Sequence, residues 1–166
     1  MTQSVPSHTG PAALIKLAQD VLNTEIAGLA AVRDRLNART PEKAPLVLAL
    51  GLLAACTGRV VVTGIGKSGL VGRKLAATFS STGTPAFFLH PVEGAHGDLG
   101  SLRKDDVIIA ISNSGETAEL NAILPALKSL GTSLIAMTGR EDSTLGRLAD
   151  VTLHSGVPRE ACPHGL

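Results

Sequence analysis

Short apolar runs alternate with stretches of helical periodicity over residues 59–153, and this alternation constrains the fold more than any other feature. The runs are Arg59–Thr63, Ala86–Leu89, Asp106–Ile111 and Ser133–Met137, with a weaker one at Val151–Leu153. Continuous apolar runs of this length are typical of strands buried on both faces of a parallel sheet. Helical patterns lie between them, at about Ser68–Ser81, Ala118–Leu130 and Ser143–Ala149. The order predicts an α/β fold, a doubly wound three-layer sandwich with a five-stranded parallel sheet.

Two helices are expected before the first strand. From Pro11 to about Asn37, apolar residues recur at steps of three and four, which predicts a helix. A second helical stretch is expected to run from Pro41 to about Cys56, with Thr40 as its N-cap. Because both helices precede the strands, we expect them to lie outside the sheet. Apolar stripes on such helices are typical of a core or of a dimer face.

The length of 166 residues fits a single domain. Residues 1–10 are polar and are expected to form a disordered tail, and residues 11–166 are expected to form the domain. The chain stops at Leu166, soon after the last predicted strand.

Composition narrows the classes of function. The net charge is +1, and the chain has no Trp, no Tyr and three Phe, which argues against a nucleic-acid partner. The longest apolar run, Ala44–Cys56, is shorter than the roughly 20 residues of a membrane span, so no membrane partner is expected. Two cysteines, Cys56 and Cys162, are too few for a disulfide framework, and Met1–Gly10 has no secretory pattern. We therefore expect a soluble, cytoplasmic protein.

Polar or glycine-rich segments follow the four stronger strands. They are Gly64–Gly69, His90–Asp98, Ser112–Thr117 and Thr138–Arg140. In open α/β sheets, ligands bind beyond the carboxyl ends of the strands. The candidate site therefore lies among these four segments.

The segment Gly64–Gly69 matches two phosphate-binding patterns in part. Its glycine spacing fits the dinucleotide fingerprint, but that pattern requires an acid at the end of the second strand, where His90 stands. Its Gly-Lys-Ser triplet resembles the end of a P-loop, which requires glycine at the position of Val61. Both interpretations are set aside.

The segment Ser112–Thr117 is the sharper signal. Ser112, Ser114 and Thr117 place three hydroxyls around Gly115, where the next helix is expected to begin. Backbone N–H groups at a helix N-terminus favour an anion such as phosphate, and glycine lets the backbone approach it closely. No Walker-type aspartate accompanies the segment, which favours a phosphate monoester over Mg-ATP. The alternative is simple capping of the helix by Ser114.

Six titratable side chains stand around these segments or near the end of the chain: Lys67, His90, His96, Glu116, Glu119 and Glu160. A lysine and carboxylates beside a phosphate can transfer protons next to a carbonyl group. Structural alternatives remain for several of them. Glu119 could complement the helix dipole, Glu116 could be solvated, and His90 could be a hydrogen-bonded loop residue. The nearby Arg140 could pair with Glu141 or Asp142.

Five segments, in this order and spacing, resemble one known family. They are Gly64–Gly69, Phe79–Pro85, His96–Asp98, Ile111–Glu116 and Glu160–Pro163. Together they are similar to the sugar isomerase (SIS) domain of the D-arabinose 5-phosphate isomerases, over about residues 58 to 166. The resemblance implies interconversion of D-arabinose 5-phosphate and D-ribulose 5-phosphate through an enediolate. In that family the product feeds 3-deoxy-D-manno-octulosonate synthesis for lipopolysaccharide or capsule.

The resemblance also implies roles for individual residues. The implied catalytic residues are Lys67, Glu119 and Glu160. The implied substrate-binding residues are Ser68, Gly83, Thr84, His90, His96, Ser112, Asn113, Ser114 and Thr117. No cofactor is required, and a zinc ion bound by His90 would be inhibitory. The implied partners are a sugar phosphate and further copies of the chain, in a dimer or tetramer.

One departure from the family concerns the C-terminus. Family members continue past the Cys-Pro-x-Gly-Leu segment with a long helix, a further active-site histidine and usually a pair of CBS modules. The sequence ends at that segment, so we expect a C-terminally incomplete domain. Two alternatives to an isomerase stay open: a non-catalytic phosphosugar-binding module and an inactive remnant. The presence of Lys67, Glu119 and Glu160 favours the enzyme, because a binding module needs only the phosphate segment.

Overall fold

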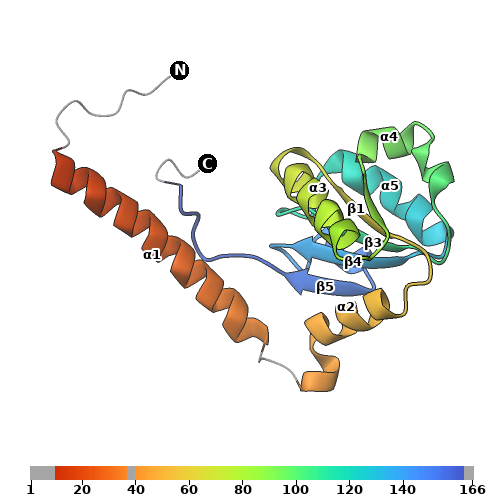
Figure 1. Cartoon of the computed structure of the whole chain (residues 1–166), viewed down its shortest axis with the longest axis horizontal. Helices are drawn as coiled ribbons and strands as arrows, with labels where there is room; N and C mark the ends of the chain where they lie inside the picture. Colours follow the sequence, from red (N-terminus) through yellow and green to blue (C-terminus); the bar gives the residue numbers. More distant parts are fainter. Residues whose placement is uncertain (1–9, 37–39, 163–166) are drawn as a thin grey trace. The chain divides into compact units, whose positions relative to one another are not determined.

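A five-stranded parallel sheet forms the centre of the fold in the computed structural model, which describes residues 10–36 and 40–162 (Figure 1). The strands lie in the order β2-β1-β3-β4-β5, and every neighbouring pair is parallel. Their bounds are Val60–Gly64 for β1, Ala86–Leu89 for β2, Val107–Ile111 for β3, Ser133–Thr138 for β4 and Val151–His154 for β5. The predicted α/β class is confirmed, and each predicted strand is present within a residue or two of its expected ends.

Both faces of the sheet are buried, which explains the continuous apolar runs. Successive side chains of a strand point to opposite faces. Val61 and Ile108 therefore join one hydrophobic cluster, while Val60, Val62 and Ile109 join the other.

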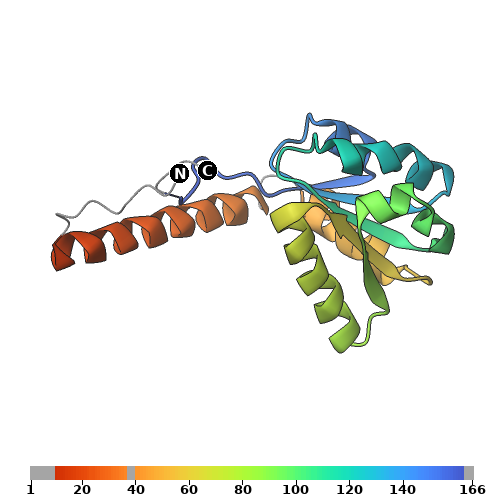
Figure 2. The ribbon, with the colours of Figure 1, turned by 90° about the horizontal axis from the view of Figure 1, so that it is seen from above.

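Helices cover each of these clusters, so the sandwich has three layers (Figure 2). One face packs against α2 (Pro45–Ala54) and α3 (Gly66–Ser81). The other packs against α5 (Ala118–Ser129) and α6 (Thr144–Leu148), with α4 (Pro91–Ala95) beside α5. The three helices predicted between strands are thus present.

The predicted continuous helix from Pro41 to Cys56 is wrong. A short 3-10 turn, Pro41–Lys43, comes first, and α2 begins only at Pro45. Between them Ala44 is extended, with φ −65° and ψ 129°. A residue that precedes proline is disfavoured in the helical region, so Pro45 splits the stretch in two. Thr40 makes no side-chain capping bond to this turn, and α2 covers the sheet through buried Ala49.

The segment after β2 contains more structure than expected. It forms α4 and a 3-10 turn, Asp98–Ser101, where only a loop was predicted. Pro91 occupies the first helical position, which suits its locked φ and missing N–H. His90 caps this helix, because its Nδ1 accepts a hydrogen bond from the N–H of Val92 at 3.3 Å.

Two carboxylates organise the amino ends of the strands. The fully buried Asp106 side chain accepts hydrogen bonds from the N–H groups of Arg59 at 2.8 Å and Arg103 at 2.9 Å. Asp150 accepts a hydrogen bond from the N–H of Leu134 at 2.7 Å. These bonds join the starts of neighbouring strands.

Residues 10–35 and 157–162 form a second unit, apart from Leu36–Gly156. It contains all but the last residue of α1 (Pro11–Leu36), which confirms the predicted first helix. The apolar stripe of α1 is exposed, with Ile26 at 62% and Leu29 at 71%. The single domain predicted over residues 11–166 stays a prediction. The expected disordered tail falls on residues 1–9, which lie outside the described residues, and on Gly10.

Across the part of the chain that the structure describes, no helix has both the length and the apolar character needed to cross a membrane.

Candidate functional site

The sheet order places a binding crevice at the carboxyl ends of β1 and β3. The chain runs outward from β1 in opposite directions, to β2 on one side and to β3 on the other. Ligands of doubly wound sheets bind at such a switch point. Gly64, the last residue of β1, is level with Ile111, the last residue of β3. The segments that follow these two residues therefore start side by side.

The segment after β1 is a tight turn into α3. A Cβ added to Gly64 would lie 2.9 Å from the carbonyl oxygen of Ile111, and one added to Gly69 would lie 2.8 Å from that of Gly64. Only glycine lets the helix begin so close to the strand ends. The N-cap residue, Ile65, has no polar side-chain atom to accept from the first N–H groups of α3. Exposed Lys67 lies in that first turn, so both the helix dipole and the ammonium group favour an anion.

The segment after β3 is held by hydrogen bonds to its own hydroxyl groups. The Oγ of buried Ser112 lies 2.8 Å from Oγ1 of Thr117 and accepts the N–H of Gly115 at 3.1 Å. Ser114 Oγ accepts the N–H of Glu116 at 3.1 Å. The segment Ser112–Thr117 is called the hydroxyl loop from here on.

The capping alternative for Ser114 is wrong. Helix α5 begins at Ala118, and its N-cap is Thr117. The hydroxyl of Thr117 contacts Ser112 and makes no capping bond to the N-terminal N–H groups of α5. Those N–H groups therefore stay available to a ligand at the same edge as the start of α3.

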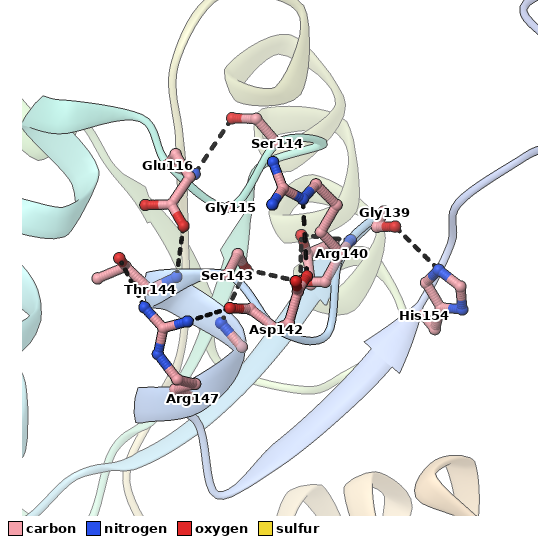
Figure 3. A network of polar contacts seen from close by, with 12 residues as sticks. Ser114, Gly115, Glu116, Gly139, Arg140, Asp142, Ser143, Thr144, Arg147 and His154 are labelled. Carbon is pink, nitrogen blue, oxygen red and sulfur yellow. Dashed lines mark hydrogen bonds and ion pairs between the residues drawn. The ribbon is translucent and has the colours of Figure 1, made fainter.

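Residues at the carboxyl end of β4, and those that follow it, contact the hydroxyl loop (Figure 3). The carbonyl oxygen of Asn113 accepts hydrogen bonds from the N–H of Gly139 at 2.9 Å and from Thr138 Oγ1 at 3.3 Å. The carbonyl of Gly115 accepts the N–H of Leu145 at 3.1 Å. Gly115 has φ +65° and lies directly against Ser143, so a larger residue cannot fit there. These contacts fasten the loop to the end of β4 and to the start of α6.

Glu116 is exposed, as expected, but it is bound to the protein. Its Oε1 accepts the N–H of Thr144 at 2.8 Å, which caps α6 (Figure 3). Hydrogen bonding by the side chain of Thr144, and then by its backbone N–H, lowers the pKa of Glu116 below its ordinary value of 4.5, and the positive charges of Arg147 and Arg140 add to the effect. As expected, Arg140 pairs with an acid of its own segment, since its Nε lies 3.6 Å from Asp142 Oδ1.

The two histidines lie at either end of α4, after β2. His90 is half-buried, its ring lies edge-on to Phe88, and its Nδ1 is used by the cap described above, as the structural alternative predicted. Its Nε2 stays available to a ligand. His96 is exposed at the C-cap of α4. Within residues 10–36 and 40–162, no three His, Cys, Asp or Glu side chains gather as a metal site.

The carboxyl edge brings together most of the residues expected at the site. Lys67, Ser68, the hydroxyl loop, Glu119 and His90 all follow the carboxyl ends of β1, β3 and β2. Glu119 lies exposed in the first turn of α5, where its two interpretations, base and dipole partner, both remain open.

Two expected residues lie toward the other edge of the sheet, and a third belongs to the other unit. Gly83 and Thr84 follow α3 and precede β2, so they lie toward the amino edge of the sheet, and Gly83 has φ +92°. Glu160 belongs to the unit that contains α1. Its neighbours Arg159 and Ala161 line a hollow of about 340 Å³ with residues of that helix.

Sequence reasoning missed the supports of the loop. Thr138 was noted only as part of a polar exit, Ser143 only as the start of a helix, and His154 not at all. Thr138 and Ser143 are fully buried. A polar residue directly after a buried strand was the available signal for Thr138 and for His154.

The model of the SIS domain matches residues 53–165, which is more than half of the chain. The chain belongs to the SIS domain family. The resemblance predicted from the five segments is thereby confirmed, together with the fold.

Among curated relatives, the arabinose 5-phosphate isomerase KdsD of Salmonella typhi is 52% identical over 148 residues, which cover 89% of this chain. That of Escherichia coli K12 is 60% identical over 111 residues, which cover 67%. The matched regions span 43% and 34% of the lengths of these relatives. A structure of an Escherichia coli CFT073 protein in complex with arabinose 5-phosphate aligns with a TM-score of 0.81 and 44% identity, covering 95% of this chain and 80% of that one.

Proposed function

We propose that this SIS domain binds D-arabinose 5-phosphate and isomerises it to D-ribulose 5-phosphate. The observation that carries the proposal is the hydroxyl loop, held rigidly beside the starts of α3 and α5 at the switch point of the sheet. Two helix N-termini, three hydroxyls and one lysine follow the carboxyl ends of neighbouring strands, which supports binding of a phosphate monoester there. The identity to arabinose 5-phosphate isomerases and the likeness to a structure that contains arabinose 5-phosphate support the choice of sugar.

The reaction needs one base and one group that stabilises an oxyanion. The base removes the proton from C2 of the open-chain aldose, and the electron pair forms a C1–C2 double bond while negative charge develops on O1. A proton then returns to C1, O2 loses its proton and becomes the ketose carbonyl, and O1 becomes a hydroxyl. Atoms and electrons balance without an oxidant. A carboxylate suits the first step and an ammonium group the second.

We assign these roles to a glutamate and to Lys67. Lys67 lies in the first turn of α3, beside the hydroxyl loop, where its charge can stabilise the enediolate or assist ring opening. Glu119, in the first turn of α5, is the base candidate at this edge. Glu160 is the second candidate, as the family resemblance implies.

The remaining parts of the proposal concern partners and context. We propose that no metal is required, with zinc at His90 acting only as an inhibitor. We propose a cytoplasmic homo-oligomer, dimer or tetramer, that serves lipopolysaccharide or capsule synthesis. Exposed apolar side chains on α2 and α3, such as Leu50 at 54% and Leu70 at 68%, support association. In an oligomer, Gly83 and Thr84 of a second copy could complete the substrate contacts.

A proton NMR time course in D₂O tests the proposal. Purified chain and D-arabinose 5-phosphate are expected to yield ketose signals, with solvent deuterium entering the product at C1. Lys67→Ala is expected to lower the rate by about a hundredfold, a typical loss when one group that stabilises developing charge is removed. Lys74→Ala is the matched control on the same helix, because the Lys74 ammonium group donates to Thr78 and lies two turns further on.

Two results would count against the proposal. Sugar phosphate that binds without ketose formation would leave a phosphosugar-binding module, the alternative from the sequence. Absence of both binding and turnover would leave an inactive remnant. Equal rates in Lys67→Ala and the wild type would overturn the role of Lys67 alone.

A further inference from the structure

We infer that His154 is a positioning residue for the hydroxyl loop and acts through Gly139. The inference rests on the proposed function, because it concerns the loop to which the phosphate group is assigned. His154 is the last residue of β5, the edge strand of the sheet, and within the described residues it makes no hydrogen bond to the hydroxyls of the loop or to Lys67.

The contact is a short chain of hydrogen bonds across three strand ends. His154 Nε2 lies 2.9 Å from the carbonyl oxygen of Gly139, toward which the ring points in Figure 3. Because a carbonyl oxygen only accepts, the ring carries a proton on Nε2 in this contact. The N–H of Gly139 in turn donates to the carbonyl of Asn113 at 2.9 Å, inside the hydroxyl loop. His154 is therefore two hydrogen bonds away from the loop.

Two glycines make room for this arrangement. A Cβ on Gly139 would lie 2.7 Å from Asn113 Oδ1. A Cβ on Gly156 would lie 2.7 Å from His154 Nε2 and 2.8 Å from the carbonyl oxygen of Gly139. Side chains at either position would push the three segments apart. The N–H of Ser155 also donates to the carbonyl of Thr138 at 2.9 Å, so the pairing of β4 and β5 continues past the strands.

This position explains why a histidine outside the crevice should affect binding. Asn113 lies between Ser112 and Ser114, two of the three hydroxyls assigned to the phosphate. A small displacement of its backbone changes the direction of these hydroxyls and weakens every bond that they make. Removing the imidazole donor also leaves the carbonyl of Gly139 without its side-chain partner, since β5 is the last strand on that side.

Two substitutions separate the donor from the bulk of the ring. His154→Phe keeps a ring but has no donor, whereas His154→Gln places an N–H donor at a similar reach. Thr152→Val is the matched control, because it removes a side-chain hydrogen bond from the same strand, to the carbonyl of Gly146, and leaves the contacts of His154, Gly139 and Asn113 intact. Each full-length chain is titrated with D-arabinose 5-phosphate by calorimetry, and amide hydrogen exchange is measured at Gly139.

We expect His154→Phe to bind about fivefold more weakly, the effect of one ordinary hydrogen bond, and to exchange the Gly139 amide at least about fivefold faster. His154→Gln and Thr152→Val should match the wild type in both measurements. A loss that merely reflects reduced stability would follow the urea midpoint and would not be rescued by glutamine.

Several results would overturn the inference. They are wild-type affinity in His154→Phe, equal weakening by phenylalanine and glutamine, and weakening of the same size in Thr152→Val. If the wild type does not bind the sugar phosphate, the proposed function fails separately, and exchange at Gly139 still decides: unchanged exchange in His154→Phe overturns the positioning role. If His154→Phe does not fold, Gly156→Ala replaces it, because the added Cβ displaces the ring from Gly139.

Discussion

The amino edge and the carboxyl edge of the sheet hold their adjoining segments with different chemical groups. At the amino edge, carboxylates accept backbone N–H groups at or near the starts of the strands: Asp106 accepts from Arg59 and Arg103, and Asp150 accepts from Leu134. At the carboxyl edge, hydroxyls and close glycine contacts hold the loops, and the starts of α3 and α5 have no side-chain cap.

This difference between the edges suggests that the amino edge serves stability and the carboxyl edge serves binding. Carboxylates satisfy the donors of the amino edge and supply the negative charge there, so an anion would gain little from that edge. Hydroxyls hold the loops of the carboxyl edge without neutralising the helix N-termini, so donors and positive potential stay available to a phosphate. Substitutions at the amino edge should therefore change stability, and substitutions at the carboxyl edge should change binding.

The largest expected effect is at Asp106. Asp106→Ala leaves two N–H groups without their acceptor and removes the partner of the Arg59 guanidinium, 3.6 Å away. We expect a loss of about 3 kcal/mol in the free energy of unfolding, measured in urea. Asp105→Ala, the exposed neighbour, is the control and should cost less than about 0.5 kcal/mol. Equal losses in the free energy of unfolding of the two variants would contradict the role of Asp106 at the amino edge.

Gly115→Ala is expected to lower both stability and binding, although Gly115 lies at the carboxyl edge. The added Cβ meets Ser143, and φ is +65°, so we expect a loss of about 2 kcal/mol or more in stability together with loss of sugar-phosphate binding. Gly66→Ala is the matched control, because φ is +59° but the space around it is open. It should show only the backbone cost of about 1 kcal/mol. Similar urea midpoints for the two variants would contradict the close packing of the loop on Ser143.

Ser112→Ala tests whether a substitution at the carboxyl edge changes binding more than it changes stability. It removes the hydroxyl that bonds to Thr117 and to the N–H of Gly115, so the hydroxyl loop loses its inner support. We expect about tenfold weaker binding of D-arabinose 5-phosphate by calorimetry, with a loss of only about 1 kcal/mol in stability. Ser129→Ala, which removes a hydroxyl bonded to Pro125 within α5, should leave the affinity unchanged. Unaltered affinity in Ser112→Ala would exclude the loop as the phosphate site.

The smallest effect concerns Glu116, a carboxylate of the carboxyl edge that accepts a backbone N–H group as the amino-edge acids do. Its pKa is lowered by the hydrogen bond to Thr144, so its contribution to stability is present above its ordinary pKa and is lost as the pH falls through the lowered pKa. Glu116→Gln keeps an oxygen acceptor but loses the charge. The melting temperatures of Glu116→Gln and the wild type should therefore differ slightly at pH 7 and converge as the pH falls through the lowered pKa of Glu116. A constant difference would mean that the charge is not involved.

The sequence predicted the carboxyl edge better than the amino edge. The apolar runs and the glycines and hydroxyls after them are local signals, so the sheet and the crevice could be inferred. Asp106 was assigned to a strand because its role depends on Arg59, 47 residues away, and no local pattern records that pairing. His154 was missed for the same reason, since Gly139 reaches it only through the pairing of β4 with β5.

Errors within the helices have local causes. Pro45 carries a signal that was available, because proline disfavours a helical residue before it, and it splits the predicted second helix. Helix α4 has five residues and too few turns to show an apolar period.

Amide chemical-shift mapping with D-arabinose 5-phosphate tests the contrast between the edges most directly. We predict saturable shifts at residues 65–69 and 112–119 and none at residues 103–107 or 133–134. Saturable shifts centred on the amino edge, or no saturable shifts at all, would contradict the assignment of the carboxyl edge as the sugar-phosphate site.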